Sequence, residues 1–214
     1  MHRTERMHRT VFWDLGGTLV DTYPALDAAL AAVVRRDGRE VSLKEVSRLT
    51  RRSTHEAIAA LAGRYGIAEA EFERANADLK AAWERTPPPP MPGATTLLTD
   101  IAAAGGRNLG VTPRAGASAP ALVAGLGRGG DDLISTSDGY PRKPDPTMYR
   151  VLLERHGLDA ATCLGVGDRP LDATASQAAG IDAAMLESPE LPVDDDARYS
   201  VPTLDALRPL LRLR

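Results

Sequence analysis

The sequence contains a single cysteine, Cys163, so it can form neither an internal disulfide nor a metal cluster ligated by cysteines. Aromatic residues make up 4 % of the chain and no basic run reaches five residues, which argues against a nucleic acid as the main ligand. No apolar stretch approaches the roughly 18 residues needed to cross a bilayer. The opening residues are polar and lack the apolar core of a signal peptide. We therefore expect a cytoplasmic protein without a nucleic acid or membrane partner.

The remaining composition is that of a globular α/β protein. Of its 214 residues, 43 % are hydrophobic and 26 % are charged, with a net charge of −3. From residue 91 onward, short apolar runs alternate with helix-length amphipathic stretches, which is typical of a parallel sheet with crossover helices. The predicted strands cover 107–111, 132–136, 162–167 and 181–186, and the predicted helices cover 94–104, 117–125, 146–156 and 171–179.

An earlier part of the chain predicts one further strand and a block of helices. The apolar run Val11–Trp13 predicts a strand at 10–14, whereas residues 22–90 carry apolar positions at helical spacing. Two helices are predicted to begin at the capping boxes Ser42–Glu45 and Ser53–Glu56. Because an isolated strand leaves its backbone groups unpaired, we expect the first strand to join the later sheet. The predicted organisation is a core at 9–21 and 91–214, with a helical insertion at 22–90.

Polar side chains follow three of the predicted strands. Asp14 follows the first strand, Thr112 the strand at 107–111, and Asp168 the strand at 162–167. Because the carboxyl ends of parallel strands open onto one edge of the sheet, these side chains can converge there. Lys143 follows a fourth strand, in a loop stiffened by two prolines. The sequence therefore predicts two carboxylates, a hydroxyl and an ammonium group in one pocket.

These residue types suit the binding of a metal and a phosphoryl group. Asp14, Asp168 and Asp172 are hard oxygen ligands for Mg²⁺, which binds few protein carboxylates and keeps a substrate phosphate oxygen. Thr112, Lys143 and the backbone amides of the glycine loop after Asp14 complement phosphoryl oxygens. Only three of the 26 cationic residues are lysines. This rarity favours a specific role for Lys143 over a solvated surface position.

In their order along the chain, these residues resemble the four motifs of the haloacid dehalogenase superfamily, whose members are mostly Mg²⁺-dependent phosphatases. The matching segments are Asp14–Asp21, Thr112, Lys143 and Gly167–Asp172, and the resemblance spans about residues 9–190. It implies a Rossmann-like core with a helical cap inserted after the first motif. It also implies a phosphomonoester of a small metabolite as substrate and Mg²⁺ as cofactor, and it leaves the oligomeric state open.

The resemblance also implies a role for each matching residue. Asp14 would be the nucleophile that forms an aspartyl-phosphate, and the catalytic set would be Asp14, Thr112 and Lys143. The metal would be bound by Asp14, the Gly16 carbonyl and Asp168, with Asp172 as a ligand or a support for the others. The substrate would contact Gly17, Thr18, Thr112, Lys143 and Arg169.

One position departs from the pattern of the phosphatases. Gly16 stands where they carry a second aspartate, the general acid that protonates the leaving oxygen and later activates water. Proton transfer by a placed side chain contributes about 10²- to 10⁴-fold to a rate. The resemblance therefore implies weak turnover, and substrates whose leaving group needs little protonation.

Gly16 leaves other interpretations open. A non-catalytic protein that binds a phosphorylated metabolite explains the glycine without further assumptions. A phosphonate-cleaving relative would use an imine-forming lysine of the cap, for which Lys44 and Lys80 are the candidates. Both lysines lie in amphipathic helices, where we expect a solvated face. A metal-free dehalogenase is disfavoured because it would leave Asp168 and Asp172 without a purpose.

Overall fold

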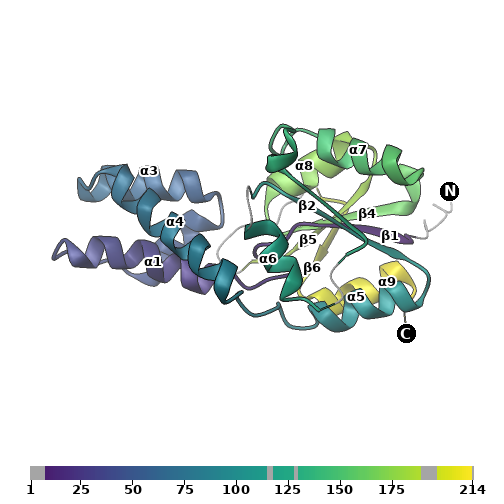
Figure 1. The fold of residues 1–214 in the computed structure, drawn as a ribbon, viewed down its shortest axis with the longest axis horizontal. Helices are drawn as coiled ribbons and strands as arrows, with labels where there is room; N and C mark the ends of the chain where they lie inside the picture. The colour runs from purple at the N-terminus through teal and green to yellow at the C-terminus, as the bar shows by residue number, and fades with distance from the viewer. Residues whose placement is uncertain (1–7, 115–117, 128–129, 189–196, 214) are drawn as a thin grey trace.

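The computed structural model describes residues 8–114, 118–127, 130–188 and 197–213. A parallel sheet lies between two layers of helices, and a separate group of helices lies at one end of it (Figure 1). The predicted fold class, a Rossmann-like α/β core with an all-helical segment, is confirmed. Among the described residues, no helix combines the length and apolar character needed to cross a membrane.

The sheet has six strands, which all pair in parallel in the order β3-β2-β1-β4-β5-β6. They are β1 (Thr10–Trp13), β2 (Arg107–Thr112), β3 (Asp132–Ser135), β4 (Cys163–Gly167), β5 (Asp182–Leu186) and β6 (Tyr199–Val201). The chain order reverses at β1, where Trp13 pairs with Gly110 of β2 and with Val166 of β4. Ligands of open α/β sheets bind at such a switch point, beyond the carboxyl ends of the strands.

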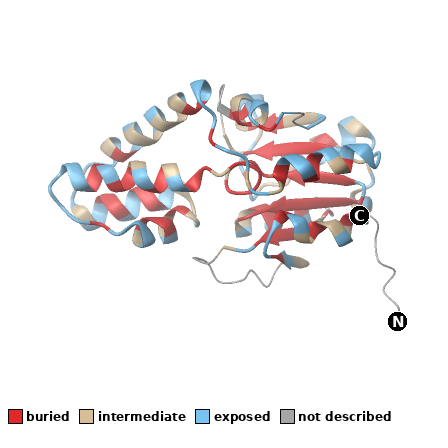
Figure 2. Ribbon diagram, turned by 90° about the horizontal axis from the view of Figure 1, so that it is seen from below, coloured by how far each residue is buried: buried red, intermediate tan, exposed pale blue. Residues whose placement is uncertain are grey.

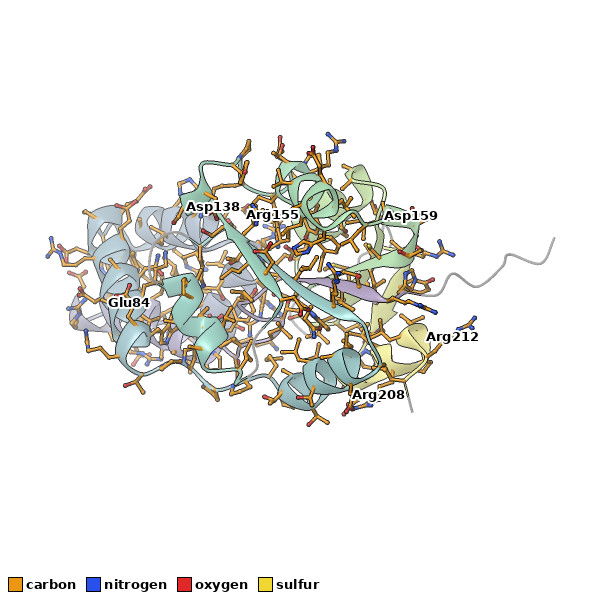
Figure 3. The ribbon with its side chains drawn as sticks, turned by 45° about the vertical axis from the view of Figure 1, so that its right-hand side comes forward. Glu84, Asp138, Arg155, Asp159, Arg208 and Arg212 are labelled. Carbon is orange, nitrogen blue, oxygen red and sulfur yellow. The ribbon has the colours of Figure 1, made fainter. Side chains whose placement is uncertain are left out.

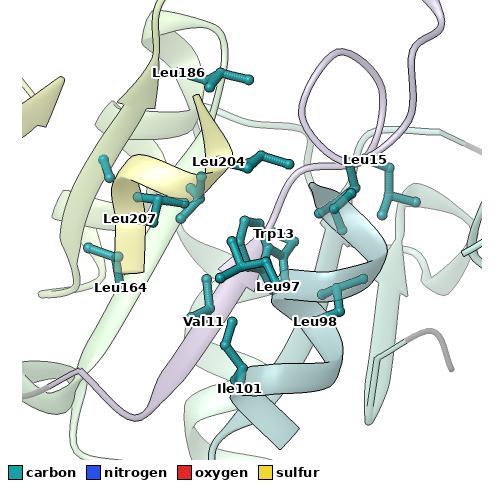
Figure 4. Close-up of a cluster of buried hydrophobic side chains, with 14 of the residues drawn as sticks. Val11, Trp13, Leu15, Leu97, Leu98, Ile101, Leu164, Leu186, Leu204 and Leu207 are labelled. Carbon is teal, nitrogen blue, oxygen red and sulfur yellow. The ribbon is translucent and has the colours of Figure 1, made fainter. Parts of the chain in front are cut away.

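Helices cover both faces of this sheet. One face carries α5 (Ala94–Ala103) and α9 (Arg208–Leu211), and the other carries α7 (Thr147–His156) and α8 (Pro170–Ala178) (Figure 1). Burial on both faces explains why the central strands read as continuous apolar runs (Figure 2). Val11 and Trp13 pack toward Leu97 of α5 in one hydrophobic cluster (Figure 4), whereas Phe12 points to the opposite face and packs on Tyr149.

The helical segment consists of four helices that lie beyond the carboxyl ends of the central strands (Figure 1). They are α1 (Tyr23–Arg36), α2 (Leu43–Thr50), α3 (Thr54–Tyr65) and α4 (Glu69–Arg85), and they share a hydrophobic cluster of their own. Both predicted N-caps are confirmed, because Ser42 accepts the Glu45 N–H at 3.2 Å and Ser53 accepts that of Glu56 at 3.0 Å. The division of the chain into domains at residues 22 and 90 stays a prediction.

Elements at the edge and between the strands complete the core. Helix α6 (Ser118–Ala124) follows β2 and packs against α4. This contact connects the core to the helical segment. Three short 3₁₀ turns cover Thr136–Asp138, Ala160–Thr162 and Leu204–Leu207. The sequence does not predict β6, since three residues at a sheet edge carry no periodic signal. Charged side chains such as Glu84 of α4 and Arg155 of α7 lie on the outer surface (Figure 3).

Candidate active site

Three carboxylates meet at the switch point of the sheet. Asp14 directly follows β1, and its N–H donates to the Val166 carbonyl at 2.9 Å, which continues the pairing with β4. Asp168 follows β4, and Asp172 lies in the first turn of α8. A Cβ at Gly167 would overlap the Asp172 side chain, so glycine permits this close approach. All three carboxylates are buried and offer oxygens within 4.8 Å of one another.

Lys143 bridges two of these carboxylates. Its Nζ donates to Asp14 Oδ1 at 2.9 Å and to Asp172 Oδ1 at 2.7 Å, and the side chain is fully buried. Burial lowers the pKa of Lys143, but the charges of Asp14 and Asp172 raise it by more, so the ammonium stays protonated. Burial raises the pKa of Asp14, and Lys143 opposes that shift. The lysine therefore fixes the Asp14 carboxylate in place and offsets its charge.

Asp168 is held by two hydroxyl groups. Thr18 Oγ1 donates to its Oδ1 at 3.0 Å, and the Tyr23 hydroxyl donates to its Oδ2. Gly17 makes this arrangement possible: its φ of 93° is left-handed, and a Cβ there would overlap both Tyr23 and Asp168. Burial raises the pKa of Asp168 to about 6, although the nearby Arg169 lowers it. Because Tyr23 begins α1, the helical segment contacts the acid cluster directly.

Arg169 supplies the second cation of the cluster. Its backbone N–H donates to Asp172 Oδ2 at 3.1 Å. Burial lowers the pKa of its guanidinium, but the charges of Asp172, Asp14 and Asp168 raise it by more. The three carboxylates thus face Lys143 and Arg169, and Asp14 also raises the pKa of Arg114, which burial lowers. The close approach of the three carboxylates, and the lone pairs that remain on their oxygens, fit a divalent cation with hard oxygen ligands.

A cavity of about 630 Å³ lies between this cluster and the helical segment. The core contributes Asp14, Gly16, Thr112, Lys143 and Arg169 to its lining. Of the two carboxylates predicted to share one pocket with Thr112 and Lys143, Asp14 lines the cavity, whereas Asp168 is buried and is not among the lining residues. Tyr23, His55, Lys80 and Trp83 line it from the helical segment. Thr18 is fully buried and donates to Asp168, and neither it nor Gly17 is among the residues that line the cavity.

Several residues of the cavity are not identified by the sequence motifs. Tyr23 and Arg114 are missed, although each lies within a few residues of a motif, Tyr23 after the glycine loop and Arg114 two residues after Thr112. The expectation that Lys80 lies on a solvated face is wrong, because it is partly buried and lines the cavity. Lys44 is exposed and is not among the lining residues, as expected. The rarity of lysine in this chain could have drawn attention to Lys80.

This geometry defines an α/β protein with a buried carboxylate cluster at the carboxyl edge of a parallel sheet, beside a cavity that is lined by the core and by the helical segment. The chain belongs to the haloacid dehalogenase-like hydrolases, because the model of that family matches residues 8–180. It is 32 % identical over 193 residues to a phosphoglycolate phosphatase of Rhodospirillum rubrum, covering 84 % of this chain and 80 % of that protein. The protein is thus a hydrolase, and this relative is a phosphatase.

Further comparisons agree with this family. Phosphoglycolate phosphatase 1 of Pseudomonas aeruginosa is 30 % identical over 224 residues, covering 96 % of this chain and 79 % of that protein. Among solved structures, a haloacid dehalogenase family hydrolase of Deinococcus radiodurans with bound phosphate and sodium superposes with a TM-score of 0.80 at 21 % identity. It covers 97 % of this chain and 96 % of that one, and it supports the fold.

Proposed function

We propose that this protein is a Mg²⁺-dependent phosphatase of small phosphomonoesters that forms an aspartyl-phosphate on Asp14. The observation that carries the proposal is the buried cluster in which Lys143 joins Asp14 to Asp172 at one wall of the cavity. A carboxylate fixed by a lysine beside a space for an anion has the geometry of a nucleophile. The chain's membership of a hydrolase family supports it.

The metal would be bound by Asp14 and Asp168, with Asp172 as a ligand or a support, and by the carbonyl oxygen of Gly16. The three carboxylates fit this role because they are buried and converge within 4.8 Å. When bound, Mg²⁺ supplies positive charge that stabilises the phosphoryl oxygens during transfer.

The residues of the chain divide the remaining work. The Thr112 hydroxyl and the Lys143 ammonium, which both line the cavity, donate to the phosphoryl oxygens. The backbone N–H groups of Gly17 and Thr18, expected to contact the substrate, instead donate to the carbonyls of Val20 and Leu15. An oxygen of Asp14 then attacks phosphorus, the bond to the leaving oxygen breaks, and that oxygen keeps the electron pair. Water next attacks the aspartyl-phosphate, releases inorganic phosphate and restores the carboxylate. Arg169 offsets negative charge at the rim throughout.

Gly16 affects the rates of both steps of this reaction. Since glycine has no group to donate a proton, the leaving oxygen takes its proton from water, and no side chain at this position activates water for the second step. We therefore infer that the aspartyl-phosphate persists and that weakly basic leaving groups are favoured. Small metabolites fit, since the helical segment, acting as a cap, limits the cavity to about 630 Å³. The relatives named phosphoglycolate phosphatases support a phosphorylated acid; a cytoplasmic location stays a prediction.

An aryl phosphate tests this function directly. We expect hydrolysis that requires Mg²⁺ and is lost in Asp14→Asn, whereas the exposed Asp78→Asn, which removes the same charge from α4, retains it. Mass spectrometry of the protein quenched during turnover should find phosphate on Asp14. Equal rates for Asp14→Asn and the parent would reject the mechanism. Binding of phosphorylated metabolites with Mg²⁺ but without turnover of any of them would favour the non-catalytic alternative.

A phosphonate-cleaving reaction is the second candidate, and the position of Lys80 favours it. Burial lowers the pKa of Lys80, as do the charges of Arg114 and Arg142, so the neutral amine needed for an imine is more accessible than in a solvated lysine. Borohydride reduction in the presence of an aldehyde-bearing phosphonate would trap an imine on Lys80. No mass increase on this lysine would eliminate the candidate.

A further inference from the structure

Arg114 occupies the space beside Gly16. A Cβ built on Gly16 would lie 3.2 Å from Arg114 Nη2 and 3.1 Å from Thr22 Oγ1, which is closer than most Cβ contacts. The Arg114 guanidinium carbon lies 4.7 Å from the centre of the Trp83 ring, and its backbone N–H donates to Thr112 Oγ1 at 3.3 Å. The missing side chain at position 16 therefore leaves room for a cation that lies between the core and the helical segment.

Arg114 also has unused capacity to bind an anion. It lines the cavity, and its Nη1 is buried without a hydrogen-bond partner among the residues that the structure describes. A buried donor without an acceptor costs free energy, and a guanidinium is suited to two parallel hydrogen bonds with a carboxylate or phosphate. An anionic ligand in the cavity would satisfy this group.

Two further cations line the same part of the cavity. Lys80 comes from α4, and Arg142 comes from the loop after β3. Burial lowers the pKa of Lys80, and the charges of Arg114 and Arg142 lower it further, so the three cations lie near one another. Within the described chain, Glu73 is the one carboxylate besides Asp14 in the cavity lining, and it is exposed. Burial lowers the pKa of Arg114 and the charge of Asp14 raises it, so the guanidinium also acts on the nucleophile's end of the cavity. The three cations together attract an anion.

We propose that Arg114, with Lys80 and Arg142, forms a second anion subsite that binds a carboxylate or phosphate on the leaving part of the substrate. The subsite rests on the proposed function, because Asp14, Thr112 and Lys143 then engage the other end of the same molecule. It makes the substrate class a small phosphomonoester whose alcohol carries a negative charge. Gly16 places no side chain against this face of the guanidinium.

A matched pair of substrates tests the subsite. Phosphoglycolate and 2-hydroxyethyl phosphate have the same length and differ in a carboxylate against a hydroxymethyl group. We expect the parent protein to favour phosphoglycolate in kcat/KM. Arg114→Gln should lower that preference about 10- to 100-fold, as the loss of a charge-assisted hydrogen bond does. Arg85→Gln, an exposed charge removal on α4, should leave it unchanged. A bisphosphate of a short diol is tested alongside. Comparing the loss of kcat/KM in Arg114→Gln for this bisphosphate and for phosphoglycolate shows whether Arg114 contributes more to binding a second phosphate or a carboxylate.

A second variant guards against a folding effect of Arg114→Gln. Gly16→Asp places a carboxylate beside Arg114 Nη2, where it should pair with the guanidinium and reduce the preference for phosphoglycolate without removing the arginine. An equal loss for both substrates of the pair in Arg114→Gln, or an unchanged preference in both variants, would overturn the subsite.

A binding experiment separates the failure of the subsite from the failure of the proposed function. Calorimetry with Asp14→Asn and Mg²⁺ should show tighter binding of phosphoglycolate than of 2-hydroxyethyl phosphate, and Arg114→Gln in that background should abolish the difference. Binding with this preference but no turnover by the parent would reject the phosphatase and keep the subsite. Turnover by the parent without any preference would reject the subsite and keep the phosphatase.

Discussion

Replacing Lys143 by methionine tests the physical account of the acid cluster most severely. Lys143 Nζ lies 2.9 Å from Asp14 Oδ1 and 2.7 Å from Asp172 Oδ1, and all three side chains are buried. Methionine keeps the unbranched apolar stem and removes the ammonium. The change therefore isolates the charge: two buried carboxylates lose their shared partner, while the packing around the stem is largely retained.

The expected loss of stability is large. Removing one partner of a buried ion pair destabilises a protein by about 3–5 kcal/mol, because the other charge stays buried without compensation. A domain of this size loses about 2–4 °C in Tm for each kcal/mol, so we expect a decrease of roughly 6–20 °C at pH 7 without Mg²⁺. The decrease should become smaller at pH 5, because burial raises the pKa of Asp14 and favours its uptake of a proton. It should also become smaller on addition of Mg²⁺, which replaces the lost positive charge.

Urea unfolding at pH 7 and pH 5, with EDTA or with Mg²⁺, measures these effects. Lys44→Met is the matched control, since Lys44 is exposed on α2 and the same substitution there should change the free energy of unfolding by about 0.5 kcal/mol or less. The reasoning is refuted if Lys143→Met is as stable as this control at pH 7 in EDTA. An effect that is the same at both pH values, and with or without Mg²⁺, would show that lost packing and not charge is the cause.

Two further predictions concern other buried groups. Because burial raises the pKa of Asp168 to about 6, above its unfolded value of about 3.9, its contribution to stability is present below about pH 4 and is lost as the pH rises through about 6. The metal-free protein should therefore lose free energy of unfolding between pH 4 and 6, and Asp168→Asn should flatten this dependence; a parent and variant with the same slope would contradict it. Burial also raises the pKa of Cys163 to about 11, so iodoacetamide at pH 8 should alkylate it in urea but not in the native protein, and rapid native labelling would contradict its burial.

The sequence predicts those parts of the site that depend on local order and on sheet topology. Asp14 and Asp168 each follow an apolar strand and Thr112 is the last residue of one, and parallel strands bring their carboxyl ends to one edge. The convergence of these residues therefore follows from chain-local signals and one general rule. The fold class is also predictable from local signals, because the hydrophobic periodicity of the sequence indicates the alternation of strands and helices.

The contacts between the helical segment and the core are not predictable in this way. Periodicity assigns residues to the faces of a helix, but it does not say which other element covers that face. Lys80 is placed wrongly on a solvated face because α4 turns that side toward the cavity. The hydrogen bond from the Tyr23 hydroxyl to Asp168 likewise depends on the turn at Gly17, which has a positive φ. The sequence does not tell where this turn directs the start of α1.

The surroundings of Gly16 change what its substitution means for the site. From the sequence alone, glycine at this position removes a proton-transferring group and implies weak turnover. The structure adds that a Cβ at 16 would lie 3.2 Å from Arg114 Nη2, a close contact that a small shift of the arginine side chain would relieve. A carboxylate at 16 would also pair with that guanidinium and withdraw it from any anionic substrate. Proton transfer by a carboxylate at position 16 and anion binding by Arg114 therefore oppose each other through this ion pair. In this chain the glycine leaves the buried Arg114 Nη1 available to an anion.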